Sequence, residues 1–188
     1  MNKLILATAL SAISTAGFAA PETFNVEPTH TYPRFEYSHF GYSNQVQRFD
    51  KTSGKIVLDR AAKSGSVDVT IDAKSINTGY ALFNQHIQAE DYVHIEKFPA
   101  ISFKSTSVKF DGDKPVAIEG TLTIKGVSKP VTLTVTSFHA MPHPMLKKDA
   151  IGANASTTVK RSEFNMGKNV PYVSDEVKIS IAVEAIKE

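Results

Sequence analysis

The most constraining feature of this chain is a strict alternation of apolar and polar side chains over many short segments. In residues 67–72, Val67, Val69 and Ile71 alternate with acidic and hydroxyl side chains. The same period of two occurs in residues 34–39, 101–104, 121–124, 131–136 and 179–183. Because successive side chains of a β-strand point to opposite faces, this pattern predicts half-buried strands.

Short turn-forming sequences separate these segments. Gly stands beside Ser, Asp or Lys at residues 52–54, 63–65, 111–113 and 125–126. Such residues favour tight turns, so the spacing predicts a meander of about eight antiparallel strands. Eight such strands form either a two-sheet sandwich or a closed barrel. If the barrel closes, its interior is either filled by side chains or holds one small ligand.

A single segment, residues 80–92, favours a helix. It lacks proline and clusters of β-branched residues, and its apolar spacing fits a helix with one apolar side. The residues on that side are Leu82, Phe83, His86, Ile87 and Glu90. We expect a short lid or plug, after which Pro99 returns the chain to an extended conformation.

The N-terminus has the pattern of an export signal. A basic Lys3 precedes an apolar run and a Gly-Phe-Ala cleavage sequence, which together are typical of a secretory signal peptide. The apolar run is shorter than the roughly 20 residues that a bilayer-spanning helix needs. We predict a signal peptide over residues 1–19, removed by cleavage after Ala19, and one domain over residues 20–188.

Composition excludes several kinds of site. The chain has no Cys, which rules out disulfides, thiolate metal sites and a cysteine nucleophile. Its 21 Lys and Arg nearly balance 19 Asp and Glu, so nucleic acid is not an expected partner. Stability must therefore come from packing, for which 11 Phe and 6 Tyr supply large apolar surfaces.

The histidines offer few catalytic arrangements. His139 and His143 have the spacing of a helical metal pair, but Pro142 between them excludes a helix, so we expect no metal site. His39 shares the inward phase of its strand, whereas Glu36 has the opposite phase. Two alternatives stay open: a small hydrolase or isomerase that uses His39 with Glu36, and a surface-mediated interaction protein with a filled barrel.

Six stretches, in the order of the family's motifs, resemble the YceI family. They are residues 30–41, 75–78, 86–87 with 91–92, 98–106, 120–131 and 161–164. The most specific of them reads GTLTIKGVSKPV and the last reads RSEF. The resemblance covers nearly all of residues 20–188.

This resemblance implies a lipocalin-like, eight-stranded antiparallel β-barrel with one short helix, exported to the periplasm. It also implies a polyisoprenoid or other long-chain amphiphile held in a tunnel, and no catalytic activity. Residues 138–145 resemble the part of the family associated with isoprenoid quinones. Phe83, Asn84 and Gln85 stand where the family often has Arg-Asp, which favours a less anionic head group such as that of ubiquinone.

We therefore predict a periplasmic carrier that sequesters an isoprenoid quinone or polyprenyl lipid, with no other cofactor. The predicted tunnel-lining residues are Phe35, Tyr37, His39, Phe83, His86, Ile87, Phe103, Leu122, Ile124, Leu133, Met141, Met145, Phe164 and Met166. The protein is not expected to be membrane-integral, while a transient membrane contact and a homodimer are left open. The alternation alone does not distinguish a ligand tunnel from a filled core.

Overall fold

The computed structural model describes residues 20–188, so the predicted signal peptide lies outside the described residues. The strands are β1 (Glu22–Val26), β2 (Tyr32–His39), β3 (Ser43–Phe49), β4 (Thr52–Asp59), β5 (Ser64–Asp72), β6 (Ile76–Asn77), β7 (Ala100–Asp111), β8 (Lys114–Ile124), β9 (Val127–Pro142), β10 (Asp149–Lys160) and β11 (Glu176–Lys187). The helical elements are the 3-10 turns η1 (Ala73–Ser75) and η2 (Arg161–Phe164) and the α-helix α1 (Ala81–Gln88).

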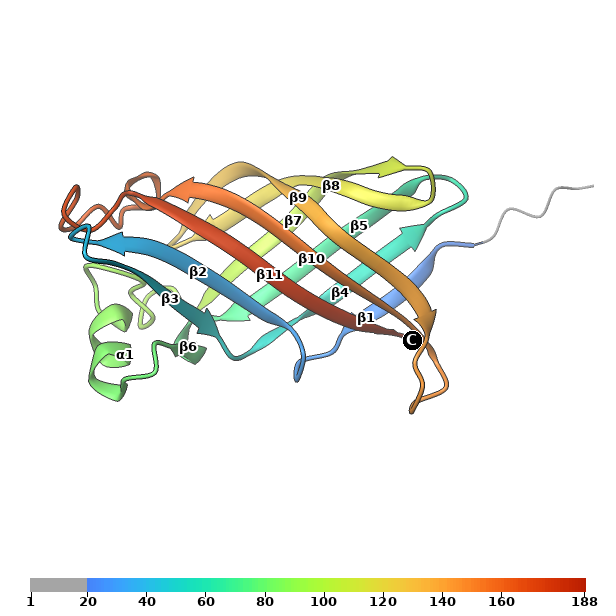
Figure 1. The fold of residues 1–188 in the computed structure, drawn as a ribbon, viewed down its shortest axis with the longest axis horizontal. Coiled ribbons are helices and arrows are strands. Elements are labelled where there is room, and N and C mark those ends of the chain that lie inside the picture. The colour runs from blue at the N-terminus through green and yellow to red at the C-terminus, as the bar shows by residue number, and fades with distance from the viewer. Residues whose placement is uncertain (1–19) are drawn as a thin grey trace, which may run out of the picture.

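The strands form an elongated antiparallel barrel (Figure 1). Its ring runs β1-β4-β5-β7-β8-β9-β10-β11, and β11 pairs back onto β1, so eight strands close it. The predicted eight-stranded closed barrel with one short helix is therefore confirmed, and the sandwich is excluded. Closure pairs the edges that an open sheet would expose.

Two strands share one side of β11. Val26 of β1 lies opposite Ala185, and Tyr32 of β2 lies opposite Ala182. On their far side, β4 pairs with β1 and β3 pairs with β2. One part of the barrel wall is thus built from two interrupted strands. The first consists of β1 and β2, with a break at residues 27–31, and the second consists of β4 and β3.

Hydrogen bonds to a single residue of β11 hold this break closed. The main-chain N–H of Glu27 donates to the Glu184 carbonyl at 2.8 Å. The Thr31 hydroxyl donates to the same carbonyl at 3.2 Å and accepts from the Glu184 N–H at 3.1 Å. Thr31 is almost wholly buried, so its hydroxyl replaces the strand pairing that is missing here.

Two bulges reverse the inward phase of long strands. The β7–β8 register shifts between Ser105 and Ser107, and the β9–β10 register shifts between Asn154 and Ala155. A bulge adds one unpaired residue to a strand, so side chains beyond it change face relative to those before it. As a result Val108 of β7 and Phe138 of β9 point into the barrel.

The two ends of the barrel carry different elements (Figure 1). One end, here called the α1 end, has α1, the β2–β3 turn and the segment between η2 and β11. The opposite end has the β4–β5 and β7–β8 turns and the β9–β10 loop. Among residues 20–188, no helix is long and apolar enough to cross a membrane.

The helix is shorter than the predicted segment of residues 80–92. It ends at Gln88, because Ala89 takes an extended conformation and the chain turns back. The Val93 N–H then donates to the Ile87 carbonyl at 3.1 Å, which lets both apolar side chains be buried. Leu82, predicted on the apolar side, is 63% exposed.

Replacing Thr31 by Val tests the closure at β11. Val keeps the shape of the side chain but leaves the Glu184 main-chain groups without their side-chain partner, so the free energy of unfolding should fall by about 1–3 kcal/mol. Chemical denaturation of both proteins measures the difference. The matched control is Thr132→Val on the exposed outer face of β9, which should change stability by less than about 0.5 kcal/mol. Equal effects of the two substitutions would contradict the assigned role of Thr31.

The hydrogen bonds at the same break predict that the Glu27 carboxylate makes a pH-dependent contribution to the stability of the fold. Burial raises the pKa of Glu27, but hydrogen bonds from Thr29 and His30 outweigh it and bring the pKa from 4.5 down to about 2. A carboxyl group whose pKa is lowered by folding stabilises the fold at a pH above its unfolded-state pKa. This stabilisation is lost as the pH falls toward its folded-state pKa. Glu27→Gln should therefore lower the melting temperature at about pH 5 and do so much less at about pH 2.5.

The hydrogen bond to Glu27 raises the pKa of His30, so in the wild-type protein this imidazole is protonated at both pH values. A loss of melting temperature that stays constant between the two pH values would show that the Glu27 carboxylate is not the group responsible.

Candidate functional site

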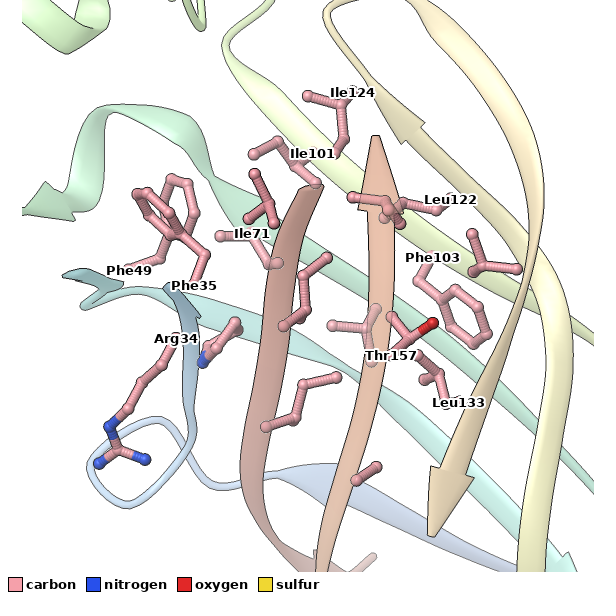
Figure 2. Close-up of a pocket in the computed structure, with 18 of the residues that line it drawn as sticks. Arg34, Phe35, Phe49, Ile71, Ile101, Phe103, Leu122, Ile124, Leu133 and Thr157 are labelled. Atoms are coloured by element: carbon pink, nitrogen blue, oxygen red, sulfur yellow. The ribbon is translucent and has the colours of Figure 1, made fainter. Parts of the chain in front are cut away.

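An apolar cavity of about 440 Å³ lies inside the barrel. Every strand of the ring contributes to its wall, and Figure 2 shows side chains such as Ile71, Leu122 and Leu133 converging on the same space. The volume falls within the range of about 300–1,000 Å³ that small-molecule pockets occupy. The side chains therefore do not fill this barrel.

Most of the predicted tunnel residues reach this cavity. The predicted residues in its wall are Phe35, Tyr37, His39, Phe83, His86, Ile87, Phe103, Leu122, Ile124, Leu133 and Met166. The first three come from β2, the next three from α1 and the following four from β7, β8 and β9. Helix α1 thus packs as a cover on the barrel, with Ile87 buried beneath it.

The structure corrects three of the predicted residues. Met141 and Met145 are 61% and 84% exposed, because the end of β9 and the loop after it extend beyond the barrel (Figure 1). Phe164 is buried among core side chains but is not part of the cavity wall. Its place in the 3-10 turn η2 removes it from the strand alternation.

The cavity opens at the α1 end. Among all residues of its wall, those with exposed side chains are His39, Phe40, His86 and Asn169, and all four belong to elements of that end. Wall residues toward the opposite end, such as Leu58, are buried or half-buried. We call the four exposed residues the mouth.

Polar groups gather at the mouth and just inside it. Asn169 donates a hydrogen bond from Nδ2 to the Tyr92 hydroxyl at 3.1 Å, and the Tyr92 ring lies 5.2 Å from that of His86. Burial raises the pKa of Tyr37, so its hydroxyl stays protonated and able to donate. Together with Arg161 these residues form what we call the polar collar. Farther in, the wall is almost entirely aliphatic and aromatic.

The guanidinium of Arg161 fixes one side of the collar. It donates from Nε to the Ser174 carbonyl at 2.9 Å and from Nη2 to the Val173 carbonyl at 2.7 Å. Its Nη1 donates to the carbonyls of Lys168, at 2.8 Å, and Met166. Burial lowers the pKa of this side chain. Because its donors are directed at main-chain carbonyls, Arg161 holds the segment that carries Asn169 in place.

The wall offers no arrangement for acid–base catalysis by His39. No Asp or Glu occurs among the described residues of the wall. Glu36 lies opposite Lys178 and Val46 on the outer face of β2, as its phase predicts. The ring of His39 instead packs edge-on to Phe40 at 4.5 Å. A general base of this kind needs a partner that orients it, so the geometry does not support the hydrolase alternative.

Several wall residues were not predicted from the sequence. Val108 and Phe138 follow the bulges described above, and strict alternation places them outside. Arg161, Tyr92 and Asn169 lie in turns and loops, where periodicity carries no signal. One signal was available: Ala153, Ala155, Thr157 and Val159 alternate with polar residues along β10, and all four line the cavity.

Comparison with known proteins agrees with the fold. The profile of the YceI-like domain family matches residues 24–185. A UPF0312 protein of Shewanella denitrificans is 34% identical, and the alignment covers the whole of both chains.

Two solved structures share the architecture. Burkholderia cenocepacia BcnA is 25% identical, with a TM-score of 0.73 over 85% of this chain and 99% of that one. A polyisoprenoid binding domain from Saccharophagus degradans, implicated in plant cell wall breakdown, matches with a TM-score of 0.65 over 88% and 98% of the two chains. Its identity of 16% supports the fold alone. On the strength of the family profile and the full-length relative, the chain belongs to the YceI-like family.

Proposed function

We propose that this protein is a periplasmic carrier that sequesters the chain of an isoprenoid lipid inside its barrel. The unfilled apolar cavity with an opening at one end carries the proposal. Such a space suits a long apolar tail, because each buried CH₂ group contributes about 0.8 kcal/mol before the costs of ordering are subtracted. The name of the Saccharophagus degradans domain, a polyisoprenoid binding domain, supports the same class of ligand.

The polar collar is the place for the head group. A tail that fills the aliphatic part of the wall leaves its polar end beside Tyr37, His86 and Asn169. Tyr37 and the histidines supply hydrogen-bond donors without a fixed charge. A head group with carbonyl oxygens, such as a quinone, matches this set.

The cationic groups near the cavity also favour a neutral head group. Arg161 directs its donors at four main-chain carbonyls. Arg34 contributes to the wall but points its guanidinium away from the apolar side chains (Figure 2). A diphosphate would need charged partners. We therefore favour an isoprenoid quinone over a polyprenyl diphosphate.

The lipid that copurifies with the protein tests the assignment directly. The full chain is expressed for export, purified from the periplasmic fraction without detergent, and extracted with organic solvent for mass spectrometry. We expect close to one molecule of an isoprenoid lipid per protein, and we expect this lipid to be a quinone. A lipid-free protein that also takes up neither added ubiquinone nor added polyprenol would overturn the proposal.

N-terminal sequencing of the same sample tests the predicted export. Cleavage after Ala19 predicts a mature chain that begins at Ala20. A protein that is retained in the cytoplasm with Met1 intact would contradict the proposed location while leaving the lipid assignment to its own test.

A cavity-filling substitution separates lipid binding from stability. Ala155 is buried in β10 and faces the cavity, so Ala155→Phe should occupy the space of the tail and reduce bound lipid at least about tenfold. In a filled barrel the same change would overpack the core and cost about 1–3 kcal/mol. With the cavity present we expect little loss of melting temperature.

The matched control places the same ring on the outside. Ser156→Phe changes the next residue of β10, whose partners Ser180 and Thr134 lie on the outer face, and it should leave the lipid content unchanged. If Ala155→Phe keeps its full lipid load, or if both variants lose it equally, the cavity is not the binding site.

A further inference from the structure

Exposed apolar side chains surround the mouth of the cavity. Tyr42 is 90% exposed, Tyr172 is 68% exposed and Leu82 is 63% exposed. We call the full set the apolar rim. It consists of Phe40, Tyr42, Tyr80, Leu82, Val170 and Tyr172. These residues lie in the β2–β3 turn, at the start of α1 and in the segment between η2 and β11, which are the elements of the α1 end (Figure 1).

Direct contacts join two of the three segments that carry the rim, the β2–β3 turn and the segment after η2. The Phe40 N–H donates to the Tyr172 carbonyl at 2.7 Å, and the two rings stack with centroids 6.0 Å apart. The segment after η2 is in turn tied to the turn after α1, through the Lys168–Asp91 ion pair and the Asn169–Tyr92 hydrogen bond. Phe40 also belongs to the mouth. Through Phe40 and Tyr172, the apolar rim therefore reaches the opening of the cavity.

The stretches that carry the rim side chains contain no fixed charge, and the nearby Lys168 and Asp91 are paired with each other. Residues 37–47, 75–89 and 169–174 contain no Asp, Glu, Lys or Arg. The opposite end of the barrel differs, because exposed Met145 and Leu146 are followed directly by two lysines and Asp149. Charged side chains are expensive to transfer out of water, so the rim can leave water at a much lower cost than the other end.

The backbone conformation of Phe40 also keeps its side chain at the surface. Its φ of 53° lies in the left-handed region, which is unfavourable for a bulky residue. The following Gly41 shares this region with a φ of 72°, and the Tyr172 carbonyl holds the turn in place. The turn thus keeps an aromatic ring half-exposed at the mouth instead of folding it into the core.

We propose that the apolar rim inserts into the interfacial region of a phospholipid bilayer and so brings the mouth into contact with the lipid phase. This inference rests on the proposed function, because a carrier for an isoprenoid lipid must collect it from a membrane. Tyr suits this position, since its ring is apolar and its hydroxyl reaches the water. Because the rim side chains are uncharged, membrane binding through them needs no anionic headgroup and is insensitive to salt. A ligand that passes through such a contact does not have to cross water.

Flotation with vesicles of pure phosphatidylcholine tests the contact. The rim variant combines Tyr42→Ser, Leu82→Ser and Tyr172→Ser, none of which lines the cavity. The control variant combines Val116→Ser, Met145→Ser and Leu146→Ser, which are exposed apolar residues of the opposite end. We expect wild type and control to float with the vesicles equally at low and high NaCl, and the rim variant to bind at least about tenfold less.

Thermal melting followed by circular dichroism checks that each variant is folded. If the triple rim variant does not fold, Tyr42→Ser alone, at the most exposed of these positions, should reduce binding in the same direction. Three outcomes would overturn the proposal: wild type that does not float, a rim variant that floats like wild type, or binding that salt abolishes. A wild-type dimer that the rim substitutions convert to a monomer would also overturn it, by showing that the rim covers a second copy.

Loading experiments separate this inference from the proposed function. Ubiquinone diluted from ethanol should load wild type and rim variant to the same level, whereas ubiquinone carried in vesicles should load the rim variant at least about tenfold more slowly. Wild type that loads from ethanol but shows no contact with vesicles refutes the docking alone. Wild type that is free of copurified lipid and takes up no ubiquinone and no polyprenol from ethanol refutes the proposed function.

Discussion

The pairing of β11 with both β1 and β2 is the constraint on which the rest of the structure depends. A barrel closes only if its last strand has a partner along its whole length. Unpaired main-chain groups at an edge destabilise the fold when they are buried and promote aggregation when they are exposed. Here the partner is supplied in two pieces, with Thr31 and Glu27 bonded to Glu184 at the junction. The interruption lets β2 and β3 extend the wall toward the α1 end. There they carry Tyr37, His39 and Phe40 to the opening of the cavity.

Alternation predicted the strands and most of the inner surface, because the barrel wall is one pleated sheet. It left a sandwich and a barrel both open, and the closed barrel was predicted from the resemblance to the YceI family. Every residue assigned to the inside from the period of two in 67–71, 131–135 and 179–183 lines the cavity. The pattern failed where the pleat itself is broken. Beyond the bulges of β7 and β9 the inward phase reverses, so Val108 and Phe138 were missed. A bulge is set by the register of two strands, and that information is not contained in either strand alone.

Three residues of the polar collar were not predicted from the sequence, for a different reason. Tyr92, Arg161 and Asn169 come from turns and loops that have no periodicity, and their convergence depends on long-range contacts. Met141 and Met145 were wrongly placed in the tunnel, because a flexible apolar side chain at the end of β9 or in the loop after it gives no sign of which end of the barrel it occupies. The sequence could separate neither a filled core from a cavity nor one end of the barrel from the other.

The distribution of polarity along the cavity constrains the direction in which an amphiphile can enter. The wall residues with exposed side chains all lie at the α1 end, and the polar collar lies at that opening and just inside it. The inner part of the wall offers almost no partner for a polar head group, and burial of such a group without a partner costs several kcal/mol. In the function proposed above, an amphiphile therefore enters tail first and leaves head first through the same opening. Its head group would stay beside Tyr37, His86 and Asn169, where a membrane or another protein can reach it while the tail remains out of water.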